Sequence, residues 1–262
     1  MEATTARAPF AAALRGWRER RRVSQLELAL RAGTTQRHVS FIESERSVPG
    51  RAMVVRLAEA LEVPLRERNA LLLAAGYAPA YPETPLDDDA LAPVRAALDR
   101  ILEGHLPYPA VIADRRGDLV SSNAAFDALT AGAAPELLQP PVSIARLLLH
   151  PRGLAPRIAN FGDWAWHVID VLERERVRNP DERLSALIEE LTGYVGERPR
   201  AGHDHVGFAV PLRLRADEGE LRLLTTLTHF GTALDVTVSE LRLEAFLPAD
   251  EETAALLARR PR

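Results

Sequence analysis

The 262-residue sequence contains no cysteine and no lysine. Without cysteine the chain can form no disulfide and no iron–sulfur cluster, and it lacks both a thiol nucleophile and the ligands of a cysteine-containing zinc finger. The common enzyme signatures are absent too: we find no G-x-S-x-G, no H-E-x-x-H, no G-x-G-x-x-G and no phosphate-binding loop. We therefore expect a protein that is not an enzyme and that has no catalytic residues.

Long hydrophobic runs are also missing from the sequence. No segment approaches the roughly 18 consecutive apolar residues of a membrane-spanning helix. The N-terminal residues show no hydrophobic core of a secretion signal. These two absences lead us to expect a soluble, cytoplasmic protein that has no membrane partner.

Histidine offers the one hint of a metal site. His203 and His205 flank Asp204 and could in principle chelate a metal ion. Neighbouring side chains of one loop rarely supply a whole site, however, and the next histidine lies far away in the sequence. A solvated loop explains these residues better, so we predict no metal site and no cofactor other than a bound effector.

Charge is distributed unevenly along the chain. Residues 1–82 contain 13 arginines and 8 acidic residues, a balance of +5, whereas residues 83–262 contain 20 arginines and 29 acidic residues, a balance of −9. A small basic region joined to a larger acidic one is expected when only the first meets DNA phosphates. The length of the chain also suits two domains. We therefore expect a DNA-binding domain followed by a domain with another task.

The most informative run covers residues 25–42 and reads Q-L-E-L-A-L-R-A-G-T-T-Q-R-H-V-S-F-I. Two helices that cross sharply need a small side chain where they touch, which Ala29 provides. Their connecting turn needs a residue that tolerates positive φ, which Gly33 provides. Val39 and Ile42 lie three residues apart on one face of the second helix, where they would close a small core.

Capping signals mark where these two helices begin. Ser24 and Glu27 form an S-x-x-E capping box for the first helix, and Thr35 is a natural N-cap for the second. Spacing and caps together predict a helix-turn-helix, whose second helix enters the major groove of DNA.

Flanking patterns extend this motif to a complete domain. Apolar residues at helical spacing precede and follow it, and Pro64 can start a last helix. The words S-Q-L-E-L-A, A-G-T-T, V-S-F-I-E-S-E-R-S-V-P and L-A-E-A-L-E-V-P resemble the XRE-type, phage-repressor-like DNA-binding domain over about residues 9–76. The resemblance implies an all-α domain of five helices, which we assign to residues 1–76.

The second helix of the motif carries the side chains expected to read DNA bases. Gln bonds adenine bidentately and Arg bonds guanine, so Gln36 and Arg37, in the exposed first turn, are the expected readers. Gln25 at the start of the other helix and Arg46 in the following loop are placed for phosphates. The alternative for each is ordinary solvated surface. The predicted DNA-binding residues are Gln25, Thr35, Gln36, Arg37, Ser40 and Arg46.

The rest of the chain alternates β-like and helical segments. Two short strands are expected within residues 109–122 and helices within 143–192. Three β-like runs rich in Leu, Thr and Val follow, at 208–215, 220–230 and 236–246. This order is that of an α+β, PAS-like domain with a five-stranded antiparallel sheet.

Proline and acidic residues set the domain boundaries. Residues 77–89 contain three prolines followed by an acidic cluster, which is typical of a semi-rigid linker. We assign residues 90–250 to the PAS-like domain and residues 251–262 to a C-terminal tail.

Four longer segments and Asn123 are informative together. The segments are L-L-L-A-A-G-Y-A-P at 71–79, P-Y-P-A-V-I-A-D-R at 107–115, L-H-P-R-G-L-A-P-R-I-A-N-F-G-D-W-A-W-H at 149–167 and H-F-G-T-A-L-D-V-T-V-S-E-L-R-L-E-A-F-L-P-A-D at 229–250. They resemble the MmyB-like transcription regulators, in which a repressor-type domain precedes a PAS-like ligand-binding domain. The resemblance covers about residues 9–250 and implies a small fatty-acyl ligand.

Segment 149–167 concentrates the chemically informative residues of the second domain. Trp164 and His167 share a helix face with Asn160, and Arg157 or His167 could pair with a ligand carboxylate. Core packing and backbone hydrogen bonds explain each residue singly at least as well. The predicted ligand-binding residues are Ile144, Leu148, Arg157, Ile158, Asn160, Trp164, His167, Val168, Leu223 and Leu227.

The expected partners follow from these features. One recognition helix covers only a few base pairs, so we expect a homodimer on a palindromic site in double-stranded DNA. We expect the second domain to bind a small apolar effector. The alternative is a second domain that holds no ligand and serves as a dimerisation or protein-interaction module.

Overall fold

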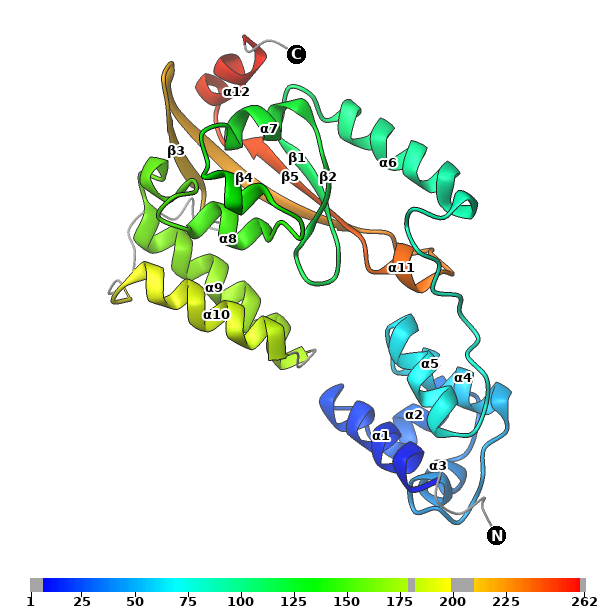
Figure 1. Ribbon diagram of the computed structural model, residues 1–262. Coiled ribbons are helices and arrows are strands. Elements are labelled where there is room, and N and C mark those ends of the chain that lie inside the picture. Colours follow the sequence, from blue (N-terminus) through cyan, green and yellow to red (C-terminus); the bar gives the residue numbers. More distant parts are fainter. Residues whose placement is uncertain (1–6, 179–181, 199–209, 260–262) are drawn as a thin grey trace. The chain divides into compact units, whose positions relative to one another are not determined.

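The computed structural model describes residues 7–178, 182–198 and 210–259, and it divides into two compact units (Figure 1). The first unit comprises Met1–Leu86 together with Gly231–Ser239, and the second comprises Asp87–Phe230 and Glu240–Arg262. The chain therefore leaves the second unit between two of its strands, contributes nine residues to the first unit, and returns. The predicted histidine-containing loop at 203–205 lies outside the described residues.

The first unit is the predicted five-helix, repressor-like domain. Gly33 has a φ of +62°, as its turn requires, and Ala29 is buried between the crossing helices. The Ser24 and Thr35 hydroxyls accept hydrogen bonds from the backbone N–H groups of Glu27 and His38. The helices are α1 (Arg7–Arg20), α2 (Gln25–Arg31), α3 (Gln36–Glu43), α4 (Arg51–Ala60) and α5 (Leu65–Ala74), with the short α11 (Val236–Ser239) beside α5.

The second unit contains the predicted five-stranded antiparallel sheet, in the order β2-β1-β5-β4-β3 (Figure 1). The first and last strands of the sequence pair in its centre, with Val111 opposite Glu244. This arrangement brings the hairpin near the start of the domain against the strand near its end. The strands are β1 (Ala110–Ala113), β2 (Leu119–Ser122), β3 (Leu212–Ala216), β4 (Gly219–His229) and β5 (Arg242–Pro248).

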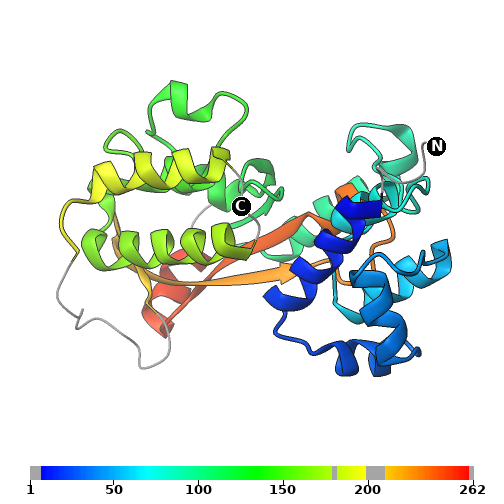
Figure 2. The ribbon, with the colours of Figure 1, turned by 90° about the horizontal axis from the view of Figure 1, so that it is seen from below.

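Helices cover both faces of β1. Val111 and Ala113 belong to the main core, so Ile112 between them points to the other face, where α6 contacts β1. On the main-core side, α9 and α10 run beside each other, and α10 also contacts α8 (Figures 1 and 2). The helices of this unit are α6 (Ala92–Gly104), α7 (Ala124–Thr130), α8 (Ile144–Leu149), α9 (Phe161–Arg178), α10 (Glu182–Val195) and α12 (Glu251–Ala258), with 3-10 turns η1 (Asp89–Leu91), η2 (Pro135–Leu138) and η3 (Ala155–Arg157).

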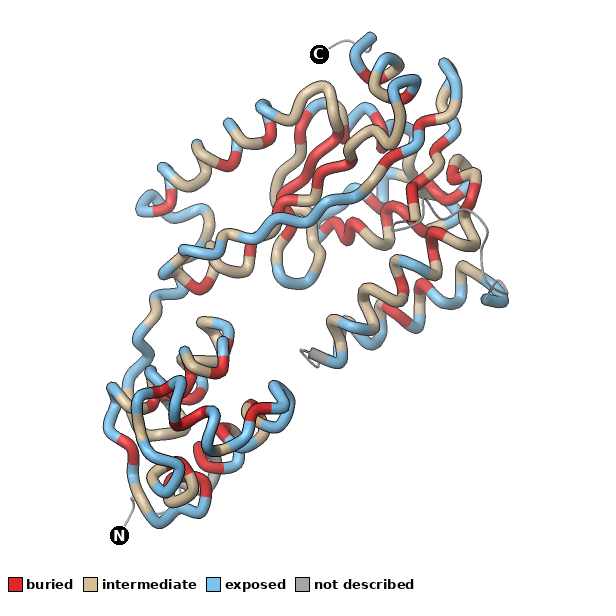
Figure 3. The backbone as a smooth tube through the Cα atoms, turned by 180° about the vertical axis from the view of Figure 1, so that it is seen from behind, coloured by how far each residue is buried: buried red, intermediate tan, exposed pale blue. Residues whose placement is uncertain are grey.

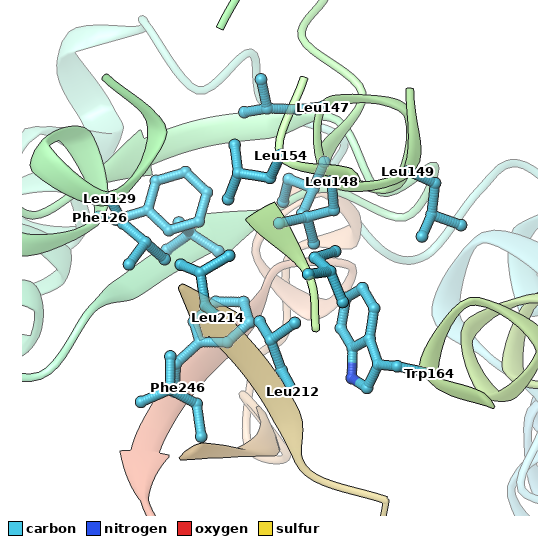
Figure 4. Close-up of a cluster of buried hydrophobic side chains, with 14 of the residues drawn as sticks. Phe126, Leu129, Leu147, Leu148, Leu149, Leu154, Trp164, Leu212, Leu214 and Phe246 are labelled. Carbon is cyan, nitrogen blue, oxygen red and sulfur yellow. The ribbon is translucent and has the colours of Figure 1, made fainter. Parts of the chain in front are cut away.

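The main core lies between the sheet and these helices. The rings of Phe126 on α7 and Phe246 on β5 stack with centroids 5.9 Å apart. Leucines from α8 and β3 fill the space around them, and Trp164 of α9 closes one side (Figure 4). Burial is concentrated in this layer and in the strands beneath it (Figure 3). The core thus consists of tightly packed side chains from helices and strands distant in sequence.

Two segments differ from the sequence-based division. Residues 236–239, expected to begin a strand, form α11 in the first unit, and β5 starts only at Arg242. Residues 251–258, expected to belong to a tail, form α12, because Asp250 caps its N-terminus through Thr253 and Leu257 is buried in the main core. Packing against the sheet therefore extends the domain beyond residue 250.

Candidate functional site

The recognition helix α3 presents one polar and one apolar face. Thr35 caps the helix, so that Gln36 and Arg37 occupy its first turn, where both are exposed. Val39 and Ile42 are buried in the core of the first unit. The burial of Val39 and Ile42 fixes the rotation of α3 about its own axis. The two predicted base readers therefore lie on its outward face.

Two arginines flank a single aromatic ring at this surface. The guanidinium carbon of Arg37 lies 5.1 Å from the ring centroid of Phe41, and that of Arg46 lies 5.9 Å from it. Cation–π attraction holds both charges beside the half-buried ring, although they come from the helix and from the loop beyond it. Ser40, also predicted to meet DNA, is half-buried beside them. Residues Arg37, Phe41 and Arg46 are called the arginine–phenylalanine cluster below.

A buried carboxylate sets the position of α3. Glu43 is 2% exposed and accepts two hydrogen bonds from Arg18, at 2.7 and 3.0 Å. The Gln25 amide nitrogen donates to the same carboxylate over 2.8 Å. Glu43 thus ties α3 to α1 and α2. Gln25, predicted to meet a phosphate, uses one of its two amide hydrogens for this internal bond and keeps the other.

Six of the predicted ligand-binding residues lie in or against the main core. Five of them are buried members of that core and Val168 packs against it half-buried; Figure 4 shows Leu148 and Trp164 beside Leu212 of β3. In the described part of the chain, these residues therefore fill the space between helices and sheet themselves. The residues are Ile144, Leu148, Ile158, Trp164, Val168 and Leu223.

Two of the predicted polar ligand-binding residues form hydrogen bonds with backbone groups instead. The Arg157 guanidinium donates to the carbonyl oxygens of Leu129, at 2.8 Å, and Arg215, at 3.3 Å. The Asn160 amide donates to the Pro211 carbonyl over 2.8 Å and accepts from the Arg213 N–H at 3.1 Å. Both side chains join the segment before α9 to neighbouring elements, which is the alternative role weighed for them above.

The other two, His167 and Leu227, are exposed, which corrects the prediction that they face inward. Trp164, Ala165 and Ile169 mark the inward face of α9, and Trp164 lies at its edge. A step of three residues from Trp164 therefore leads to solvent. Leu227 is 50% exposed because β3 pairs with β4 only as far as Leu223, and residues 225–229 are all exposed (Figure 3).

A cavity of about 340 Å³ lies elsewhere in the second unit, between the β1–β2 turn and helices α8, α9 and α10. Sequence reasoning missed it, because its walls come from five separate segments of the chain. Its apolar wall includes Leu172, Leu184 and Leu187; its charged wall includes Arg115, Arg116, Arg146, Arg183 and Arg242 with Asp118, Glu175 and Glu190.

An ion pair joins α8 and α10 at this cavity. Arg146 donates two hydrogen bonds to Glu190, each 2.7 Å long, and the Tyr194 hydroxyl donates to the same carboxylate over 2.7 Å. The hydrogen bond from Arg146 lowers the pKa of Glu190 below its ordinary value. Burial raises the pKa of Asp118 on the facing turn, and the nearby Asp114 raises it further. The cavity therefore places a paired guanidinium next to half-buried leucines.

The described residues contain neither a metal site nor a membrane-spanning helix. Among residues 7–178, 182–198 and 210–259, no three His, Asp or Glu side chains gather as a metal site would require. Within the same ranges, no helix combines the length and apolarity needed to cross a bilayer.

Comparison with known proteins matches both units. A family described as "Helix-turn-helix" matches residues 14–68, and one described as "MmyB-like transcription regulator ligand binding domain" matches residues 94–259. No curated protein matches the chain. Among solved structures, "Structure of an RNA-binding Light-Oxygen-Voltage Receptor" aligns with 98% of this chain at 18% identity and a TM-score of 0.27. This chain covers 65% of that receptor, and a likeness at this score carries no conclusion.

Proposed function

Because the chain belongs to the MmyB-like transcription regulators, we propose that its second unit binds a fatty acid or related acyl compound that controls sequence-specific DNA binding by its first unit. A helix-turn-helix domain followed by a ligand-binding domain makes it a DNA-binding transcription regulator, a class that is normally not enzymatic.

At the DNA surface, Gln36 and Arg37 read base edges from the first turn of α3. Thr35 and Ser40 lie at or near the same turn, and Gln25 and Arg46 contact phosphates around it. The observation that supports this most is the arginine–phenylalanine cluster, which holds a base reader and a phosphate contact on one outward surface. Binding site selection from randomised DNA tests the assignment.

In the second unit, the acyl chain lies in the cavity and not in the main core. The cavity volume of about 340 Å³ is within the range of small-molecule sites, and its apolar wall suits a hydrocarbon chain. Moving a carboxylate from water into such surroundings costs free energy unless a cationic partner is present. The arginines of the cavity provide that partner. Mass spectrometry of small molecules released from the denatured protein, with thermal shifts against fatty acids of graded length, tests this proposal.

One observation favours the alternative of a ligand-free interaction module. Six of the residues expected to line a pocket lie in or against the main core, where their own side chains take up space that an effector would need. If no fatty acid of any length changes the melting temperature and none is released on denaturation, this alternative accounts for the second unit.

We also propose that the regulator binds DNA as a homodimer on a palindromic operator, because one recognition helix spans only a few base pairs. Analytical ultracentrifugation of the intact protein, alone and with the selected DNA, gives the stoichiometry directly. A single protein chain on a site without two-fold symmetry would contradict this part of the proposal.

A further inference from the structure

We propose that Arg146 recognises the carboxylate of the effector by exchanging its internal partner, Glu190, for the ligand. The cavity would then take a monocarboxylate with an apolar tail, whose head group lies at Arg146. This inference rests on the proposed function only in assuming that the second unit binds a small effector. The inference adds where the effector binds and which side chain recognises its carboxylate.

The cavity wall presents guanidinium groups to an anion. Five arginines and three acidic residues line it. Two of these arginines are already paired with glutamates outside the lining, Arg115 with Glu240 at 4.0 Å and Arg242 with Glu244 at 2.8 Å. An anion would therefore be held by the geometry of an individual guanidinium and not by a net positive charge of the cavity.

The pair with Glu190 shows that Arg146 is placed to bind a carboxylate. Its two carboxylate oxygens accept from Nε and Nη2 of Arg146, the parallel geometry in which a guanidinium holds a carboxylate. A ligand carboxylate can make the same two bonds. The Arg146 and Glu190 side chains are 37% and 32% exposed, so the exchange takes place at the rim of the cavity, where water can solvate the released Glu190.

The wall beside Arg146 fits a hydrocarbon tail. Leu184 and Leu187 of α10 and Leu172 of α9 line the cavity while their other sides pack against the main core. All three are half-buried, so that a bound tail would remove further apolar surface from water. Anion recognition and tail burial are therefore adjacent, as an amphipathic acid requires.

Calorimetric titration of the full-length protein with decanoate tests the assignment, with 1-decanol as the probe that has the tail but no carboxylate. We expect decanoate to bind and R146Q to raise its Kd about tenfold or more, since hydrogen bonds between charged groups are strong. E190Q removes the competing carboxylate and should lower the Kd by about threefold or more. 1-Decanol should bind wild type and R146Q alike.

A matched ion pair outside the cavity supplies the control. Arg213 on β3 donates two hydrogen bonds to Glu220 on β4, at 2.8 and 3.2 Å. R213Q and E220Q should leave the Kd of decanoate unchanged. If R146Q does not fold, as circular dichroism would show, the tighter binding expected of E190Q still decides the question.

The outcomes separate this inference from the proposed function. Equal decanoate affinity of wild type, R146Q and E190Q would overturn the inference and leave acyl binding intact. If decanoate fails but benzoate binds wild type and is lost in R146Q, the carboxylate site stands and the acyl proposal fails. Absence of binding by decanoate, benzoate and acetate alike would overturn the inference.

Discussion

The backbone N–H of Val236 donates a hydrogen bond to the carbonyl oxygen of Pro82 over 2.8 Å. Val236 follows β4 of the second unit, yet it is fully buried within the first unit, beside the linker after α5. A second bond joins the Thr84 N–H to the Asp235 carboxylate at 3.2 Å. The connection between β4 and β5 is thus packed within the DNA-binding unit, and we expect it to couple the proposed effector site to DNA binding.

Val236→Asp should disconnect effector binding from DNA binding. A charge at this buried position expels α11 from its contact with α5, while α3 and the cavity keep their own packing. We expect the effect of decanoate on DNA affinity to disappear. Fluorescence anisotropy with labelled operator, with and without decanoate, measures it. Leu234→Asp, at a residue that is 75% exposed, is the control, and a retained effect in Val236→Asp would contradict the role of this segment.

Gln36→Ala and Arg37→Ala should each change which DNA sequences are preferred. Both side chains are exposed in the first turn of α3, where they can reach base edges. We expect a cost of about 1–3 kcal/mol at the preferred site and relaxed selectivity at one position. Selection from randomised DNA with each variant gives the comparison. Unchanged base preferences in both variants would remove them from the readout.

Arg46→Ala should instead weaken binding to all sequences alike. The side chain is exposed in the loop after α3, beside Phe41, which suits a phosphate contact. Loss of one such contact should make the slope of log affinity against log salt less negative by about 0.9. Titrations over a salt series with the preferred and a scrambled sequence measure the slope, and a sequence-selective loss would argue against a phosphate contact.

Glu43→Ala should destabilise the first unit by about 3–5 kcal/mol, because it leaves the Arg18 guanidinium without its buried partner. The pKa of Arg18 is raised, chiefly by its hydrogen bond to Glu43, so the guanidinium stays charged. Urea denaturation of wild type and variant gives the difference. Glu59→Ala is the control, since Glu59 is 52% exposed and its pair with Arg68 spans 3.5 Å, and it should cost less than about 1 kcal/mol. If Glu43→Ala lowers the free energy of unfolding as little as Glu59→Ala does, the buried pair does not stabilise the first unit.

Structure that depends on residues close together in the sequence could be predicted, whereas structure that depends on residues far apart could not. The helix-turn-helix depends on neighbours a few residues apart, such as Thr35 and His38, and these are visible in a single sequence. Arg146 and Glu190 meet across 44 residues, and no local pattern relates them. The prediction for His167 is wrong because its spacing from Trp164 and Asn160 does not show which side of α9 faces the core.

The Arg146–Glu190 pair also predicts how stability depends on pH. The pKa of Glu190 is lowered from 4.5 in the folded protein, first by the hydrogen bond from Arg146. A carboxyl group with a depressed folded pKa stabilises the protein above its unfolded pKa, and this contribution is lost as the pH falls through the folded value. The difference in melting temperature between wild type and Glu190→Gln should therefore be constant from pH 7 to about pH 5.5 and shrink below about pH 4.5. Scanning calorimetry across this range measures it, and Glu220→Gln should behave likewise, since Arg213 lowers the pKa of Glu220. A difference that persists unchanged at the lowest pH would show that packing around residue 190, and not its charge, joins α8 to α10.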